Sequence, residues 1–162
     1  MKLFSLTSIA FACAVLLFAT GGCITDNGAF PTPSANFTPK RAYAIPYDKL
    51  WQTTLDALDK NRITVVSTDK ASGIIQTDYI AGPGQLMLAL NVAQSTRYKY
   101  NITLRNESDG SVKVNVICKI EDTMNDGRGG SQWRDVTPQN AARVNSLETW
   151  LYEQIEDRLK TP

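Results

Sequence analysis

Two segments in the second half of the chain alternate between apolar and polar residues. In both 97–105 and 112–120 the even-numbered positions are apolar, and the second segment includes Cys118 among them. A period of two predicts strands with one face in a hydrophobic core and the other in water. The Ser-Asp-Gly-Ser sequence at 108–111 lies between them and predicts a hairpin turn. The Cys118 thiol is therefore expected to be buried and inert.

Two other segments have the spacing of amphipathic helices. In 47–60 apolar side chains recur at intervals of three and four residues, and Asn61 is suited to end the helix. A longer helix is predicted to begin at Thr137-Pro138, with threonine as the N-cap and proline in the first turn, and to run to about Lys160. Its apolar stripe consists of Ala141, Val144, Leu147, Leu151, Ile155 and Leu159.

Shorter strands are predicted in the remainder of the chain after residue 40. The run at 86–92 is short enough for a strand, although its composition also suits a helix. The polar, glycine-rich stretch 122–132 is expected to be a loop, and it lacks the spacing of a phosphate-binding loop. The predicted strands, in chain order, are 41–45, 63–68, 73–80, 86–92 and 133–136.

This order of elements predicts an α+β fold. One apolar sheet face and two apolar helix faces bury each other most simply in a two-layer sandwich with both helices on the same side. A long helix held against a curved antiparallel sheet is the helix-grip arrangement. We therefore expect a single domain at 41–162, in which an antiparallel sheet packs on one N-terminal helix and one long C-terminal helix.

The first 22 residues have the composition of a secretory signal peptide. Lys2 provides the positively charged start, and Leu3–Phe18 is an uncharged, mostly apolar run. This run has about 16 residues, fewer than the roughly 20 that a helix needs to span a bilayer. We therefore expect residues 1–22 to be removed rather than kept as an anchor.

The end of this leader resembles the lipobox of bacterial lipoproteins. Gly21 and Gly22 occupy the small-residue positions before Cys23, whereas Thr20 replaces the usual leucine. The resemblance implies that Cys23 begins the mature chain and carries several acyl chains, which anchor a protein stably. In enteric bacteria an aspartate after the cysteine retains lipoproteins in the inner membrane. Here Ile24 follows, which implies export to the outer membrane.

Residues 23–40 are predicted to be the lipidated cysteine and its tether. The segment contains Pro31, Pro33 and Pro39 and has few apolar side chains, which argues against regular structure. Such a composition suits a spacer between a lipid surface and a folded domain. Phe30 and Phe37 are the exceptions, and they are either incidental aromatics in a coil or part of a segment that docks on a partner protein.

The composition excludes several functional classes. Without Lys2 the chain retains 16 basic and 16 acidic residues, so no basic excess favours nucleic-acid binding. There is no histidine, which excludes the usual Ser-His-Asp and Cys-His catalytic sites and histidine-ligated metals. The acidic residues of the two helices are interpreted as solvated faces. The acidic residues so interpreted are Asp56, Asp59, Glu153, Glu156 and Asp157. We expect no enzyme activity, cofactor or metal site.

Four short motifs in the first half of the domain resemble the helix-grip domains of the BamC family. They are Pro-Tyr-Asp-Lys-Leu-Trp at 46–51, Leu-Asp-Ala-Leu at 55–58, Ile-Thr-Val-Val at 63–66 and Gly-Ile-Ile at 73–75. BamC is a lipoprotein subunit of the machinery that inserts β-barrels into the outer membrane. The resemblance implies the same fold and an outer-membrane location. The chain differs from that family in having one such domain where the family has two.

Two functional classes remain. The first is a lipid-anchored outer-membrane accessory that faces the periplasm and binds envelope proteins during assembly. The second is a module for a small apolar or lipid ligand in a cavity between helix and sheet. Large core residues favour the first class because they fill that space. The candidate partner surface consists of Trp133, Trp150 and Tyr152, although the last two are also placed to edge the core.

Overall fold

The computed structural model describes residues 29–87, 92–125 and 131–161. The predicted leader and Cys23 lie outside the described residues. The elements, in chain order, are β1 (Ala42–Tyr43), α1 (Tyr47–Lys60), β2 (Val65–Asp69), β3 (Ile74–Thr77), β4 (Ile80–Ala81), β5 (Gln85–Met87), β6 (Val92–Asn106), β7 (Val112–Asn125), β8 (Ser131–Asp135), the 3₁₀ turn η2 (Pro138–Asn140) and α2 (Ala141–Lys160).

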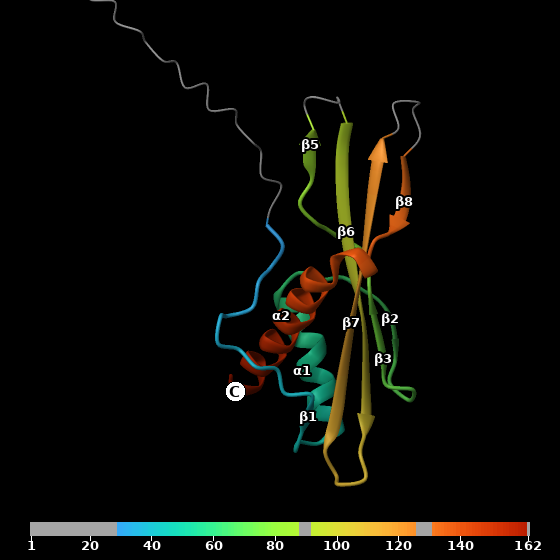
Figure 1. Ribbon diagram of the computed structural model, residues 1–162. Helices are drawn as coiled ribbons and strands as arrows, with labels where there is room; N and C mark the ends of the chain where they lie inside the picture. Colours follow the sequence, from blue (N-terminus) through green and yellow to red (C-terminus); the bar gives the residue numbers. More distant parts are fainter. Residues whose placement is uncertain (1–28, 88–91, 126–130, 162) are drawn as a thin grey trace, which may run out of the picture.

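The strands form one antiparallel sheet with both helices on the same face (Figure 1). The order of the main strands is β1-β7-β6-β3-β2, while β4 and β5 pair with β6 and β8 pairs with β7. The predicted two-layer α+β sandwich is therefore confirmed. Within the described residues, neither helix has the length and hydropathy needed to cross a bilayer.

Helix α1 occupies the predicted range, 47–60, and Asn61 is its C-cap. Its inner face buries Leu50, Ala57 and Leu58 completely. The amphipathic spacing was sufficient to locate this helix because nearly all of its stabilising burial lies on one face.

Strands β6 and β7 follow the predicted alternation, but they are longer than predicted. Even-numbered residues from Tyr98 to Leu104 and from Val112 to Ile120 are buried. The intervening turn uses Gly110 at φ +80°, a backbone conformation that a side chain disfavours. The prediction of a loop over 122–132 is wrong at both ends, because β7 continues through Asn125 and β8 begins at Ser131. Residues 126–130 lie outside the description.

Several shorter predictions are also corrected. The strand predicted at 73–80 is two strands, β3 and β4, and each pairs separately with β6. Of the run 86–92, Leu86 and Met87 belong to β5 and Val92 begins β6, whereas 88–91 lie outside the described residues. Strand β2 is displaced by two residues from its predicted start, and its pairing with β3 has a register shift between Val65 and Ser67.

The long helix begins later than predicted. The α-helical segment starts at Ala141, after the 3₁₀ turn η2. Thr137 makes no side-chain cap bond. Its hydroxyl instead accepts a hydrogen bond from the Ile120 amide at 3.0 Å. The side chain therefore satisfies a backbone donor of β7 rather than one of the helix. Ala141 is exposed and does not extend the apolar stripe, which is buried only at its centre.

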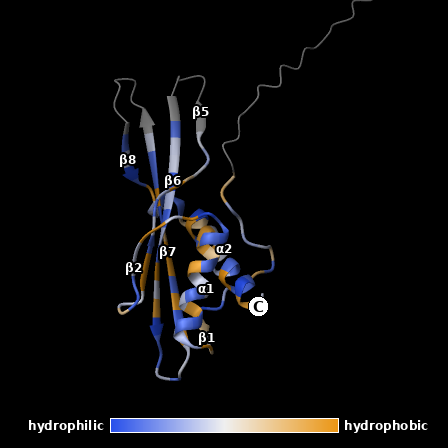
Figure 2. Ribbon diagram, turned by 180° about the vertical axis from the view of Figure 1, so that it is seen from behind, coloured by the Kyte–Doolittle hydropathy of each residue, from blue (hydrophilic) through white to orange (hydrophobic). Residues whose placement is uncertain are grey.

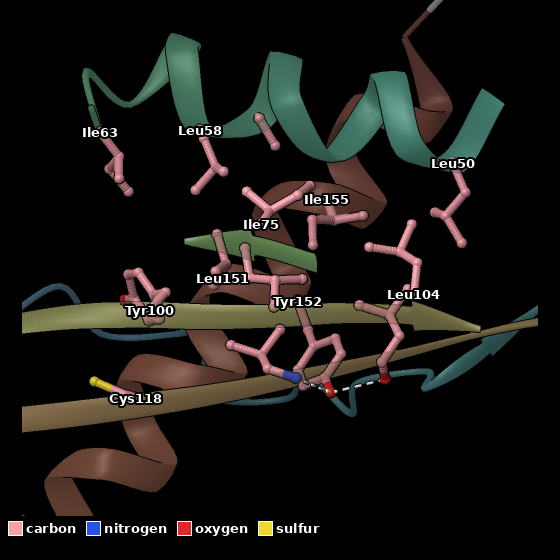
Figure 3. Close-up of a cluster of buried hydrophobic side chains, with 14 of the residues drawn as sticks. Leu50, Leu58, Ile63, Ile75, Tyr100, Leu104, Cys118, Leu151, Tyr152 and Ile155 are labelled. Atoms are coloured by element: carbon pink, nitrogen blue, oxygen red, sulfur yellow. Dashed lines mark hydrogen bonds between the residues drawn. The ribbon is translucent and has the colours of Figure 1, made fainter. Parts of the chain in front are cut away.

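Helix α2 takes the place of a strand along part of β7. Within the described part of the chain, β7 pairs beyond β6 only with β1 at 112–113 and with β8 at 121–125, so no described strand pairs with one edge of 114–120. The Tyr152 hydroxyl accepts from the Val116 amide at 3.0 Å and donates to the Val114 carbonyl at 3.1 Å (Figure 3). Glu148 accepts from the Cys118 amide at 2.9 Å. The edge is thus covered by helix side chains.

The space between helices and sheet is filled by side chains. Hydrophobic residues gather where the helices lie on the sheet (Figure 2). Tyr100 and Tyr152 are the largest fully buried residues, and they pack among leucines and isoleucines from all the main elements. Cys118 is also buried, and burial raises the pKa of its thiol to about 12. The prediction that Cys118 is buried on the inward face is confirmed. Its low reactivity stays a prediction, which the raised thiol pKa favours.

Candidate functional site

An aromatic and charged cluster lies on the sheet face opposite the helices. The Arg97 guanidinium lies 3.8 Å from the centre of the Tyr79 ring and 4.0 Å from that of Trp133. Its Nε and Nη2 both donate to Oε2 of Glu121, at 2.8 and 2.6 Å. Since the cation contacts two aromatic faces and one carboxylate, the guanidinium is held in a single orientation. We call Tyr79, Arg97, Glu121 and Trp133 the stacked cluster.

Glu121 organises the stacked cluster electrostatically. Its oxygens accept from the Tyr79 hydroxyl at 2.7 Å and from the Lys119 ammonium at 2.9 Å, in addition to Arg97. Burial raises the pKa of this carboxyl, but the hydrogen bonds from Lys119, Tyr79 and Arg97 outweigh burial and lower the pKa to about 2. Glu121 is therefore charged at neutral pH and holds two cations in place.

A surface hollow of about 420 Å³ adjoins this cluster. Tyr79, Arg97 and Trp133 line it, together with the chain around Gly82. The indole of Trp133 is 41% exposed, which is high for so large an apolar side chain. Exposed aromatic side chains beside a fixed arginine are the residue types enriched where proteins bind one another.

The three predicted surface residues do not come together. Trp133 lies in β8 on the outer face and is exposed, as predicted for a partner surface. Trp150 is half-buried and packs against the core. Tyr152 is fully buried and its hydroxyl is bonded to β7, which excludes it from a partner surface and agrees with the alternative that it belongs to the core. Alternation already placed Arg97 on the outward face, but nothing in the sequence indicated that it stacks between two aromatic rings.

Residues 29–40 lie against the domain rather than apart from it, alongside α2 (Figure 1). We call this segment the strap. The Ser34 amide donates to the Glu153 carboxylate at 2.9 Å, and the Ser34 hydroxyl also bonds to that carboxylate. The Lys40 amide donates to Glu156 at 2.8 Å. The prediction that Glu153 belongs to a solvated face is therefore wrong, because it is 9% exposed and binds the strap.

The two phenylalanines of the strap pack on the same domain. The Phe30 ring lies 5.7 Å from that of Tyr98, and the Arg143 guanidinium lies 4.4 Å from its centre. Phe37 packs against the core. These contacts differ from both alternatives that the sequence left open, because the aromatics are neither incidental nor available to a partner in this arrangement.

The described residues hold no group of three acidic or thiol side chains placed to bind a metal ion. The hollow beside the stacked cluster and a second hollow at Arg105 and Lys113 are open to the surface. The helix–sheet interface is occupied by the core. A cavity for an apolar ligand between helix and sheet was the basis of the second functional class. The filled interface gives that class no support.

Comparison with known proteins identifies the family. Among curated proteins, none matches the chain. A family model described as the outer membrane protein assembly factor BamC-like N-terminal domain matches residues 45–161, which is more than half of the chain. The resemblance carried by the motifs between residues 46 and 75 thus extends through α2. Because the match includes both helices and nearly all of the sheet, the chain belongs to the BamC-like N-terminal domain family.

Proposed function

We propose that this protein is a non-enzymatic accessory in the assembly of outer-membrane proteins. The family name describes an outer membrane protein assembly factor, and membership supports the same process here. The observation that carries a protein-binding role is the exposure of Trp133 within the stacked cluster, on a face that no other described element covers. A fixed, partly exposed aromatic surface favours association with another protein.

The proposal includes a lipid anchor at Cys23. The apolar leader and the lipobox-like residues before this cysteine support it. The domain then lies at the outer membrane and faces the periplasm, where it meets envelope proteins rather than nucleic acid. The anchor and the stacked cluster have separate tasks, because the first sets location and the second binds a partner.

Site-specific crosslinking in intact cells tests the partner-binding role. A photoreactive amino acid replaces Trp133 in one strain and the exposed Lys60 of α1 in a matched control. We expect the Trp133 position to crosslink a component of the outer-membrane assembly machinery and the Lys60 position to crosslink much less of it. Equal yields at the two positions, or no assembly component at Trp133, would contradict the role of this surface.

The anchor has its own test. Cys23→Ser should abolish metabolic labelling with a fatty acid and release the protein from the membrane fraction. Cys13→Ser is the matched control, because Cys13 lies within the predicted leader and should not affect labelling. Labelling that persists in Cys23→Ser, or that is lost in Cys13→Ser instead, refutes the anchor at residue 23.

A further inference from the structure

The sheet face opposite the helices carries two pairs of like charges at directly opposed positions. The register of β6 and β7 sets Arg105 against Lys113 and Lys99 against Lys119. Directly opposed residues have Cβ atoms about 5 Å apart, and like charges at that separation destabilise a sheet. We call these four residues the cationic face.

Among ion pairs within residues 29–87, 92–125 and 131–161, only one of the four cations is neutralised. Lys119 bonds to Glu121 at 2.9 Å and lies 3.4 Å from Asp135. Among the described residues, no carboxylate lies within 4.0 Å of the charged nitrogens of Lys99, Arg105 or Lys113. The whole chain has 17 basic and 16 acidic residues, so this surplus arises from placement rather than composition.

One like-charge pair lines a surface hollow. The hollow has a volume of about 310 Å³ and lies between Arg105 and Lys113. Thr103 and Asn115, which are themselves directly opposed, extend it along the sheet and add hydrogen-bond donors. Glu107 also lines it but forms no ion pair with either cation in the described structure. The hydrogen-bond donors of the hollow and the positive charges of Arg105 and Lys113 suit a bound carboxylate better than any neutral group.

The two pairs are separated by a stretch that suits a polypeptide. Lys113 and Lys119 are six residues apart on one strand, or about 20 Å. Ile117 lies between them on the same face and is 52% exposed. Anionic groups that reach both pairs must therefore be spaced along an extended molecule, with an apolar contact in between.

We propose that the cationic face binds an acidic, extended segment of a partner protein. One carboxylate of that segment enters the hollow between Arg105 and Lys113, a second contacts Lys99, and an apolar side chain packs on Ile117. Binding relieves the repulsion between Arg105 and Lys113, so the charges that weaken the free sheet strengthen the complex. This inference rests on the proposed protein-binding function and adds the chemistry of the partner.

An anionic lipid surface fits these residues less well. Membrane-binding surfaces combine cations with apolar side chains that enter the headgroup region together. Here the exposed apolar side chains of this face are Ile74, Ile117 and Trp133, which lie on three different strands rather than along one continuous apolar stripe. We therefore commit to an acidic polypeptide and make lipid binding an outcome of the test.

The test measures binding of the full-length, detergent-purified protein to defined probes. The first is a fluorescent ten-residue peptide of alternating glutamate and valine, and the second replaces glutamate with lysine. Vesicles of phosphatidylglycerol and of phosphatidylcholine are the third and fourth. We expect the glutamate peptide to bind at least tenfold more tightly than the lysine peptide and to weaken as salt is raised.

Two variants locate the binding site. Reversal of both charges in R105E/K113E should weaken binding of the glutamate peptide about tenfold, since it removes two exposed attractions and adds two repulsions. The matched control K49E/K60E makes the same change in net charge on α1, where both lysines are exposed, and should bind as the unmodified protein does.

A single substitution separates binding from folding. K113E turns a repulsive pair into an attractive one, so it should raise the thermal midpoint by about 2 °C while weakening peptide binding. A lower midpoint would show that the pair is not repulsive and would overturn the inference. Equal affinity for the two peptides, an unaffected R105E/K113E variant, or selective binding to phosphatidylglycerol vesicles without peptide binding would also overturn it.

Failure of this inference is distinguishable from failure of the proposed function. If Trp133 crosslinks to assembly components but the glutamate peptide does not bind, the accessory function stands and the acidic partner is refuted. If the peptide binds at the cationic face but Trp133 captures no assembly component, the surface is correct and the proposed process is wrong.

Discussion

Replacement of Tyr152 by phenylalanine tests the arrangement in which α2 covers the edge of β7. The substitution keeps the ring and removes only the hydroxyl, which bonds to the Val116 amide at 3.0 Å and the Val114 carbonyl at 3.1 Å. All three residues are buried, at 0–3% exposure. Water has no access to the two backbone groups, so both lose their partner when the hydroxyl is absent.

The expected loss follows from those two groups. An unsatisfied buried donor or acceptor costs about 1–3 kcal/mol. A buried tyrosine that satisfies two such groups should therefore contribute about 2–6 kcal/mol to the free energy of unfolding. This is a large share of the roughly 5–15 kcal/mol that stabilises a typical domain.

Urea denaturation followed by circular dichroism measures this loss against a graded series. Tyr47→Phe removes a hydroxyl that donates to the Lys70 carbonyl at 2.9 Å on the exposed surface, where water replaces it, so the expected cost is about 0.5 kcal/mol. Tyr100→Phe removes one buried bond, to the Leu147 carbonyl at 3.2 Å, and should cost about 1 kcal/mol. A loss in Tyr152→Phe no greater than that in Tyr47→Phe would refute the edge-covering role.

Three further predictions concern the strap, acid stability and the thiol. Glu153→Ala removes the acceptor for Ser34 and should speed hydrogen exchange within 29–40 several-fold, as measured by mass spectrometry, while exchange in β6 and β7 stays unchanged. Because the Glu121 pKa falls from 4.5 to about 2 on folding, its stabilisation is complete above pH 4.5 and lost as pH falls toward 2. Unfolding free energies between pH 5 and 2.5 should include this contribution, about 2–3 kcal/mol. Glu121→Gln should make the decline smaller by that amount, while carboxyls such as Asp122, whose pKa is also lowered, retain their own share. Cys118 should resist thiol reagents at pH 8 in the folded protein and react promptly in urea, because burial raises its pKa to about 12.

Much of the fold could be predicted because it depends on local patterns. Helix α1 and the alternating parts of β6 and β7 each bury one face, and the spacing of their apolar residues predicts which face that is. The extension of β7 through 122–125 could not be predicted in this way. Asp122 is polar but only 5% exposed, and its carboxylate bonds to Arg134 of β8 at 2.5 Å. A buried charge that is neutralised by a partner in another strand does not appear in the apolar–polar pattern of its own strand.

The candidate site was predictable in part for the same reason. Alternation placed Arg97 and Glu121 on the outward face, but the pairing that joins them depends on the register between β6 and β7. The sequence left open whether Tyr152 belongs to the core or to a partner surface. Its burial could not be settled from one stripe of leucines, because α2 contacts the edge of β7 as well as its face. The strap was missed because its contact with Glu153 spans 119 residues of sequence.

The strap also limits how far a lipid anchor at Cys23 would hold the domain from the membrane. A tether of residues 23–40 could extend to about 60 Å if all of it were unattached. The contacts of Phe30 and Ser34 remove most of that length, since the chain is already fixed to the domain at these residues. Six peptide units between residues 23 and 29 span at most about 20 Å. A domain held so close to the bilayer would meet partners embedded in the membrane before those free in the periplasm, which suits an accessory of outer-membrane protein assembly.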